Sequence, residues 1–282
     1  MKGRTLVIKM SSKAIFAVVA AVIIVVAGVG VYFLLNDDKD DPNDVTFLIQ
    51  DDEGVHFWLK GNGETTIDAL ENAFSAYEDG TFTKSSWGGV GELFGIGSIE
   101  NLDGDWSYWV QYTWVDDDWK YNTLGMNSIM SADVEYMLII YGKGIMDDTP
   151  LPEGLSTPSE ANVWDGSTKG VVFAIESMTG LYFYINGEGK TVYDALKNAD
   201  SKYGLDYVKN DTASGEGVFS MFGLEQYNDG GKWYWWSTNV INDDGDDWDF
   251  ASTVIGALQS SENPQVCFKY TDGTYDLTAP VY

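Results

Sequence analysis

The sequence predicts an α+β protein with two tandem domains, each a mixed sheet with one main helix, behind an N-terminal transmembrane helix. The first observation is a duplication, because residues 57–73 recur at 183–199 with a constant offset of 126 and no gap. The second is an apolar run at residues 14–35 that carries no charge. Each copy is about 100 residues long, a normal domain size, so the period indicates two globular copies rather than a solenoid.

The apolar run is 22 residues long, and as a helix it would span about 33 Å, enough for a bilayer core. Four basic residues and no acid precede it, and an acidic stretch follows. The positive-inside rule therefore places residues 1–13 in the cytoplasm and the chain beyond Asn36 outside the cell membrane. A cleaved signal peptide is the alternative. The length of the run and the lack of a small-x-small cleavage site favour an uncleaved, single-pass signal-anchor.

The charge distribution agrees with an extracytoplasmic location. All 44 acidic residues but only 12 of the 16 basic residues lie beyond residue 35, which gives that part a formal charge of −32. Such a surface repels nucleic acid, so we expect none as a partner. The membrane is expected as a partner only through the single N-terminal span. Oligomeric state is left open.

Composition shifts divide the chain into seven parts. Residues 1–13 are the basic tail, 14–35 the membrane helix and 36–44 an acidic stalk. Residues 45–142 form repeat 1, and residues 143–169, with three prolines, form an interdomain linker. Residues 170–270 form repeat 2, and 271–282 read as a polar tail without a counterpart in repeat 1.

Each repeat opens with two β-branched, apolar runs separated by turn residues, which predicts a hairpin. The runs are 45–50 and 55–60 in repeat 1, and 171–175 and 181–186 in repeat 2. A Gly-x-Gly turn and a helix follow, with Thr65 and Thr191 as N-caps in T-x-x-D capping boxes. A Gly-rich stretch, an aromatic strand, an Asp-rich loop and a closing apolar strand complete the repeat. The order β-β-α-β-β-β with one helix predicts a β-grasp-like domain.

A family resemblance rests on these same features. The motif T-V-x-D-A-L-K occurs as residues 191–197, and copy 1 has T-T-I-D-A-L-E at 65–71. With the hairpin, the Gly-rich segment and the W-x-Y-W strand, each copy resembles the C-terminal-like domain of the transcobalamin and intrinsic factor family. The resemblance implies a β-grasp ligand-binding fold and a corrinoid as a possible ligand. It departs from the animal carriers, which hold cobalamin between this domain and a helical barrel that this sequence lacks.

Catalytic and metal-binding patterns are sparse. His56 is the only histidine, which excludes a multi-histidine metal site, and no nucleophile with a base is apparent, so we expect no enzyme. The Gly-x-Gly segments do not match a phosphate loop, because no Lys-Ser/Thr follows in the required register and acidic residues crowd the site. They are expected to form structural turns before the helix. The acidic loops at 116–118 and 243–249 lack the spacing of a calcium loop and read as solvated turns, with calcium binding left open. Cys267 is the only cysteine, and we expect it to be buried.

The aromatic residues are the candidate binding site. Strand alternation puts Trp106 and Tyr108 on one face of the aromatic strand and Trp109 on the other. In repeat 2 it likewise separates Trp233 and Trp235 from Trp236. One helix can bury only one face, so the uncovered set should contact a ligand, and the sequence does not tell which set that is. Indole faces on an open sheet suit planar or sugar-like ligands.

These observations together predict a membrane-anchored, extracytoplasmic protein that binds a small molecule. The ligand would be a corrinoid or another large, partly apolar molecule, or a glycan. The alternative is a structural or adhesive surface protein whose duplicated domains present a scaffold to partners.

Overall fold

The computed structural model describes residues 41–75, 82–100, 104–143, 151–152, 155–212, 215–242 and 244–273. The predicted basic tail, the membrane helix at 14–35, most of the acidic stalk and most of the polar tail lie outside these residues. Within the described part of the chain, no helix is long and apolar enough to cross a bilayer. From Pro42 onward the chain forms one compact unit.

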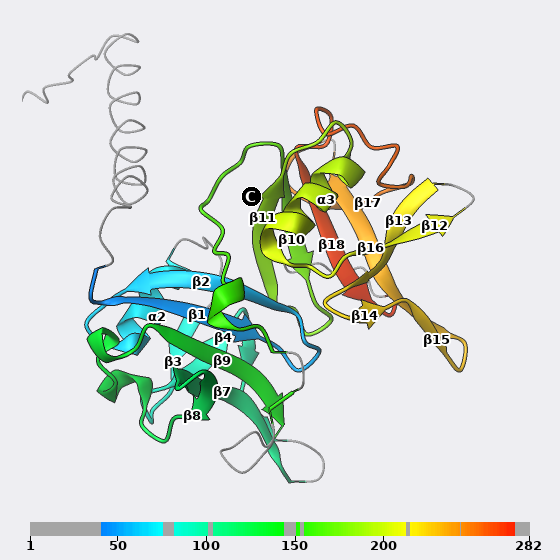
Figure 1. The fold of residues 1–282 in the computed structure, drawn as a ribbon. Coiled ribbons are helices and arrows are strands. Elements are labelled where there is room, and N and C mark those ends of the chain that lie inside the picture. Colours follow the sequence, from blue (N-terminus) through cyan, green and yellow to red (C-terminus); the bar gives the residue numbers. More distant parts are fainter. Residues whose placement is uncertain are drawn as a thin grey trace, which may run out of the picture. The chain divides into compact units, whose positions relative to one another are not determined.

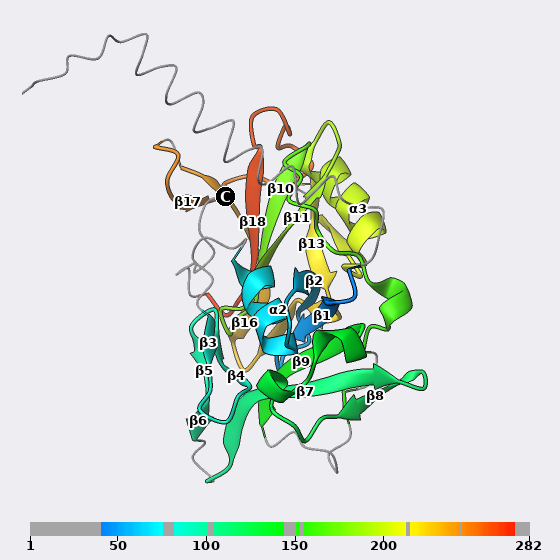
Figure 2. The ribbon, with the colours of Figure 1, turned by 90° about the vertical axis from the view of Figure 1, so that its left-hand side faces the viewer.

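The first repeat contains one mixed sheet with the strand order β2-β1-β9-β7-β6, and β8 pairs with β7. The central strands β1 (Asp44–Gln50) and β9 (Tyr136–Lys143) run parallel, and the neighbouring pairs are antiparallel. Figure 2 shows α2 (Thr66–Phe74), the one α-helix among the described residues of this repeat, against β1 and β2. The remaining strands of the sheet are β2 (His56–Asn62), β6 (Ile99–Glu100), β7 (Trp106–Val115) and β8 (Asp118–Tyr121). Short 3₁₀ turns lie at Met126–Ser128 and Ser131–Asp133.

The second repeat has the same arrangement, with the order β11-β10-β18-β16-β15 and β17 paired with β16. Strands β10 (Val171–Glu176) and β18 (Gln265–Thr271) form its parallel pair. In Figure 1 helix α3 (Val192–Tyr203) lies along one side of this sheet. The other strands are β11 (Tyr182–Gly187), β15 (Tyr227–Asp229), β16 (Lys232–Ile241) and β17 (Trp248–Phe250). The α+β class and the two similar mixed sheets, each packed with one helix, are therefore confirmed.

The Gly-x-Gly turns allow each helix to lie directly on its sheet. A Cβ atom added at Gly61 or at Gly187 would lie 2.0 Å from a helix carbonyl oxygen, that of Ala69 or Ala195. The predicted N-caps are confirmed, because the Thr65 and Thr191 hydroxyls accept hydrogen bonds from the N–H groups three residues later. The duplicated motif thus encodes helix start and helix–sheet contact.

The Gly-rich stretches form a feature that the sequence pattern did not resolve. In repeat 1, β3 (Phe82–Lys84), β4 (Val90–Leu93) and β5 (Ile96–Gly97) make a separate three-stranded sheet. In repeat 2, β12 (Val208–Thr212), β13 (Gly215–Met221) and β14 (Leu224–Glu225) do the same. These strands lack the apolar alternation that marks a strand in sequence, because they are short, rich in glycine or, as in β12 (VKNDT), mostly polar.

Equivalent aromatic residues of the two repeats contact one another. The rings of Phe57 and Phe183, which match in the duplication, stack with centroids 4.8 Å apart. Phe94 meets the ring of Tyr182 at 4.6 Å, and the matching pair Phe222 and His56 meets at 5.1 Å. The same contact therefore occurs twice, with the two repeats exchanging roles, as in an isologous dimer interface. A single buried apolar cluster accordingly includes residues of both repeats.

Candidate functional site

Two of the six predicted aromatic site residues belong to the core. Trp109 is 1 % exposed and Trp236 is 4 % exposed. Their indole N–H groups donate to backbone carbonyls, Trp109 to Ile96 at 2.7 Å and Trp236 to Leu224 at 3.0 Å. Both therefore lie on the helix-covered face. Of the two predicted sets of aromatic residues, the helix buries the one that contains Trp109 and Trp236.

The other four residues lie on the opposite face, here called the outer face of each sheet. Trp106 and Trp233 occupy equivalent positions near the start of β7 and β16 and are about half exposed, at 51 % and 52 %. Tyr108 and Trp235 are partly buried. These four remain the candidates for ligand contact.

The outer face of repeat 1 is apolar and is covered by the chain itself. Seven buried side chains form it: Leu48, Trp58, Val110, Tyr112, Trp119, Leu138 and Ile140. Residues 151–152 and 155–163, here called the return segment, pack against this cluster through Leu151, Leu155, Ala161 and Val163. The indole of Trp119 also donates to the carbonyl of Ser156 at 3.3 Å. The segment predicted as a plain linker is thus part of the fold.

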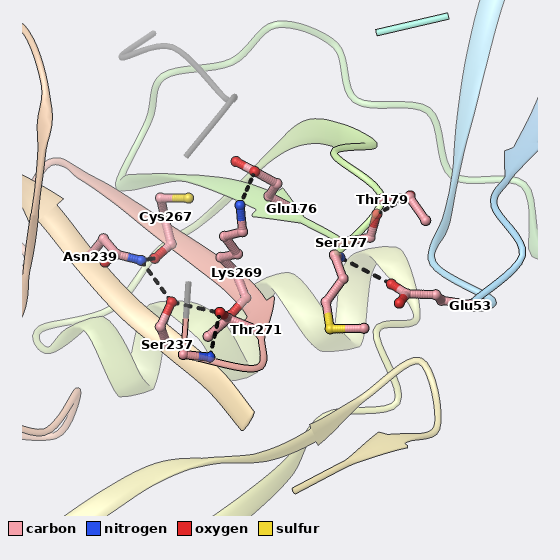
Figure 3. A network of polar contacts seen from close by, with 11 residues as sticks. Glu53, Glu176, Ser177, Thr179, Ser237, Asn239, Cys267, Lys269 and Thr271 are labelled. Carbon is pink, nitrogen blue, oxygen red and sulfur yellow. Dashed lines mark hydrogen bonds and ion pairs between the residues drawn. The ribbon is translucent and has the colours of Figure 1, made fainter. Parts of the chain in front are cut away.

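The outer face of repeat 2 is polar instead (Figure 3). The ammonium group of Lys269 lies 2.8 Å from a carboxylate oxygen of Glu176, and the two residues are 6 % and 0 % exposed. The hydroxyl of Ser237 donates to the carbonyl of Lys269 at 3.2 Å. The side-chain amide of Asn239 donates to Ser237 at 3.1 Å and to the carbonyl of Cys267 at 3.3 Å. Hydrogen bonds therefore link β10, β16 and β18 across this face.

The polar network replaces apolar residues of repeat 1 at every position but one, because Glu176 stands where repeat 1 has Gln50. Glu176 and Lys269 are directly paired across β10 and β18, as Gln50 and Ile140 are across β1 and β9. At the other positions, Ser237 stands where repeat 1 has Val110, Asn239 where it has Tyr112, and Cys267 where it has Leu138. Of these five residues in repeat 2, only Cys267 was noted from the sequence. The sequence did contain a signal for Glu176 and Lys269, because each is a charged residue within an otherwise largely apolar strand.

A buried ion pair is costly to maintain, because removing two charges from water can offset their mutual attraction. Such a pair is weak evidence for stability, and it needs further hydrogen bonds to be accommodated. Burial also raises the pKa of the Cys267 thiol well above its usual value, with the nearby Glu176 carboxylate acting in the same direction. The thiol is therefore protonated and unreactive in the folded protein.

His56 lies between the two repeats. Its Nδ1 is 2.9 Å from the carbonyl oxygen of Gly54, which can only accept, so Nδ1 carries the proton. Its Nε2 then accepts a hydrogen bond from the hydroxyl of Ser156 at 3.0 Å. Burial lowers the pKa of His56 and so favours the neutral ring. The pair fastens the return segment to β2, a contact between distant residues that sequence spacing does not show.

Two acidic residues of the turn after β1 contact the matching turn of repeat 2. A carboxylate oxygen of Asp51 accepts from the hydroxyl of Thr179 at 2.9 Å, and Glu53 accepts from the N–H of Met178 at 3.0 Å. Burial raises the pKa of Asp51 to about 6. Burial, followed by the charge of Asp51, raises the pKa of Glu53 to about 7. This junction therefore titrates near neutral pH.

The acidic loop of repeat 1 is a tight turn. Asp116 and Asp117 both have positive φ, 54° and 60°, and connect the paired residues Val115 and Asp118. A two-residue hairpin turn of this kind requires positive φ at both central positions, which Asp tolerates. Among the described residues no three His, Cys, Asp or Glu side chains are grouped to hold a metal ion.

The comparisons with known proteins do not add a family. No protein-family model matches the chain. No curated protein matches it either.

Proposed function

We propose that this chain is a membrane-anchored, extracytoplasmic protein that binds a small molecule on the outer face of repeat 2, without catalysis. The observation that carries the proposal is the polar network of Glu176, Lys269, Ser237 and Asn239 on a face that is apolar in the other copy. A few convergent polar groups beside aromatic side chains are the usual composition of a small-molecule site. Trp233 and Trp235 supply the aromatic part at one end of the same face.

The ligand class follows from this composition. Indole faces favour a planar or ring-shaped molecule, and the polar row favours one with hydrogen-bonding groups along an edge. A corrinoid has both features, and it is also what the resemblance to the transcobalamin and intrinsic factor family implies. A glycan fits the same description with smaller apolar surfaces. The β-grasp assignment and the anchor at residues 14–35 belong to this proposal, which places the site outside the cell.

The test is a binding measurement on the full chain in detergent, with hydroxocobalamin followed by equilibrium dialysis and a chito-oligosaccharide followed by tryptophan fluorescence. Trp233→Ala and Trp235→Ala should weaken binding by about 1–3 kcal/mol, as for interface hot spots. Trp106→Ala, the matched substitution in repeat 1, should leave affinity unchanged. Equal losses in both repeats would contradict the assignment to repeat 2, and absence of binding to both probes would contradict the ligand class.

A structural or adhesive role is the second candidate, and one observation favours it. The edge strand β6 of repeat 1 carries Ile99, which is 54 % exposed, and it pairs with the part of β7 that carries the half-exposed Trp106. Exposed apolar residues on a sheet edge suit contact with another protein chain. Concentration-dependent association of the wild type that Ile99→Lys abolishes would support this role.

A further inference from the structure

A groove lies between the end of helix α3 and the small sheet of repeat 2. Its volume is about 490 Å³, which falls within the range of small-molecule sites, about 300–1,000 Å³. The residues that line it include Asp200, Gly204, Asp206, Tyr207, Val208 and Ser220. They belong to α3, to the loop that follows it and to β12 and β13, whereas the outer face is formed by β10, β16 and β18. The groove is therefore separate from the site proposed above.

The loop that forms one wall of the groove is fixed by hydrogen bonds. Helix α3 ends at Gly204, where a φ of 68° turns the chain away from the helix axis. The next residue, Leu205, is buried, and its carbonyl accepts from the N–H of Phe222 at 2.7 Å. The phenol of Tyr207 donates to the carbonyl of Gly217 at 3.0 Å. The shape of the groove is therefore preformed.

The electrostatics of the groove favour a cation. Asp200 lies in the last turn of α3, where the partial negative charge of the helix end repels a carboxylate. Asp206 adds a second, exposed carboxylate, and among the described residues no lysine forms an ion pair with either of them. Lys202 contacts the ring of Tyr203 at 4.6 Å instead. The charge of Asp206 also acts on His56, but that ring is neutral and does not compensate it.

Asp200 has a structural role that leaves it able to bind a ligand. One of its carboxylate oxygens accepts a hydrogen bond from the N–H of Tyr207 at 3.1 Å. This bond holds the carboxylate at the groove and uses one of its about four acceptor positions. The remaining positions are available to a donor in the groove.

Ser220 is an independent sign of a ligand. It is 4 % exposed, and its hydroxyl has no hydrogen-bond partner among the described residues. Ser220 pairs across the strands with Val208, and because paired residues point to the same side, both side chains face the groove that they line. Burying a hydroxyl without a partner is unfavourable. The match of M-F-G at 221–223 with L-F-G at 93–95 puts Ser220 at the position of Glu92, so the fold does not require a serine here.

We infer that this groove binds a primary ammonium group, carried by a small amine or by a lysine side chain of a peptide. Such a group has three N–H donors, and the acceptors are the carboxylates of Asp200 and Asp206 and the hydroxyl of Ser220. Tyr207 and Val208 contact the apolar part of the ligand. Binding here does not depend on a ligand at the outer face.

The acceptors suit an organic cation better than a metal ion. Calcium takes about six to eight oxygen ligands at close range, and the lining side chains supply two carboxylates and one hydroxyl besides the phenol of Tyr207. The groove is also much larger than a single ion requires. An ammonium group with an attached body satisfies the acceptors and fills the remaining volume.

The experiment is isothermal titration calorimetry of the full chain in detergent, at low ionic strength, with 2-phenylethylamine. We expect one saturable site, and 2-phenylethanol, which has the same shape without the charge, should not bind. A second titration with Nα-acetyl-lysine methylamide distinguishes the two sources, because tighter binding of this probe favours a peptide and weaker binding favours a free amine. Absence of binding by both amines, or equal binding of the alcohol, would overturn the inference.

Point variants connect the binding to the groove. Asp200→Asn and Asp206→Asn should each weaken amine binding at least about tenfold, because each removes a charged acceptor. Asp249→Asn removes the same charge from an exposed position of repeat 2 outside the groove and should leave affinity unchanged. Equal losses in all three variants would indicate general attraction to an acidic surface and would overturn the inference.

Ser220→Ala separates a binding role from a structural one. It should weaken amine binding about threefold. Stability in urea unfolding should not fall, because the hydroxyl has no partner among the described residues. Lower stability with unchanged affinity would overturn the assignment of Ser220 as a ligand contact. None of these variants alters the outer face, so their failure would leave the proposed function intact.

Discussion

The outer faces of the two repeats have the same strand order and register but opposite chemistry. In repeat 1 the face is an apolar cluster sealed by the return segment. In repeat 2 the equivalent positions hold an ion pair, a serine and an asparagine. The helix-covered faces have not diverged in this way, because Trp109 and Trp236 make equivalent contacts with Tyr141 and Tyr270 at 5.1 and 5.3 Å.

The difference shows where a duplicated domain is free to change. The helix-covered face holds each repeat together, so its residues are constrained by close packing. The outer face can be apolar or polar, provided that a further layer covers it and satisfies its polar groups. Polar groups that give no clear gain in stability indicate a role other than stability, and on this basis we place the binding site on repeat 2.

The largest expected effect comes from breaking the ion pair on one side. Lys269→Ile leaves the Glu176 carboxylate buried without its partner and should lower the free energy of unfolding by about 3–5 kcal/mol. The double variant Glu176→Gln with Lys269→Ile installs the repeat 1 pair, Gln50 and Ile140. It should match the wild type or exceed it by about 1–4 kcal/mol in urea unfolding, as for other buried pairs replaced by apolar residues. A double variant as unstable as the single one would show that the network is needed for packing.

The junction between the turns should make stability depend on pH. The folded-state pKa of Asp51, about 6, lies above its usual value of 3.8, and that of Glu53, about 7, lies above 4.5. The folded protein therefore binds protons more tightly than the unfolded chain. This contribution is fully present below about pH 4 and is lost as pH rises through 6 and 7.

The check is urea unfolding at pH 5 and pH 8 for the wild type and for Asp51→Asn. The variant keeps similar hydrogen-bonding atoms but cannot titrate, so its stability should depend less on pH, by about 1–3 kcal/mol over this range. General repulsion among the acidic residues affects both proteins alike. An unchanged pH dependence in the variant would show that Asp51 does not titrate in this window.

The return segment should make a smaller contribution. Leu155 is only partly buried against the outer face of repeat 1, so Leu155→Ala should cost about 1–2 kcal/mol. Ser159→Ala, at an exposed position of the same segment, should change stability by less than about 0.5 kcal/mol. If Leu155→Ala is also neutral in thermal unfolding, the segment is a linker as the sequence first indicated.

The fold was accessible from sequence because local signals agreed with one another. The apolar hairpins, the Thr65 and Thr191 caps and the duplication each predicted the same element order. The small sheets at 82–97 and 208–225 were not predicted, because their short strands are defined by pairing between segments rather than by periodicity. The contact of His56 with Ser156 joins residues 100 positions apart, and no local pattern encodes it.

The candidate site was predicted in part. Alternation separated Trp109 and Trp236 from the four outer aromatic residues, but only packing shows which face the helix covers. Glu176 and Lys269 were visible as charges within apolar strands. Their importance became apparent only when register placed them opposite each other.

The smallest stability effect is expected at the exposed tryptophans. Trp106→Ala and Trp233→Ala remove side chains that are about half exposed, so each should change the free energy of unfolding by less than about 0.5 kcal/mol. The core substitutions Trp109→Ala and Trp236→Ala serve as references and should each cost about 3–5 kcal/mol. Urea unfolding of the four variants measures both sets. The two substitutions should change the free energy of unfolding equally. A difference in ligand affinity between Trp106→Ala and Trp233→Ala would therefore reflect binding rather than folding. A large loss of stability for Trp233→Ala alone would instead show that this residue supports the packing of repeat 2.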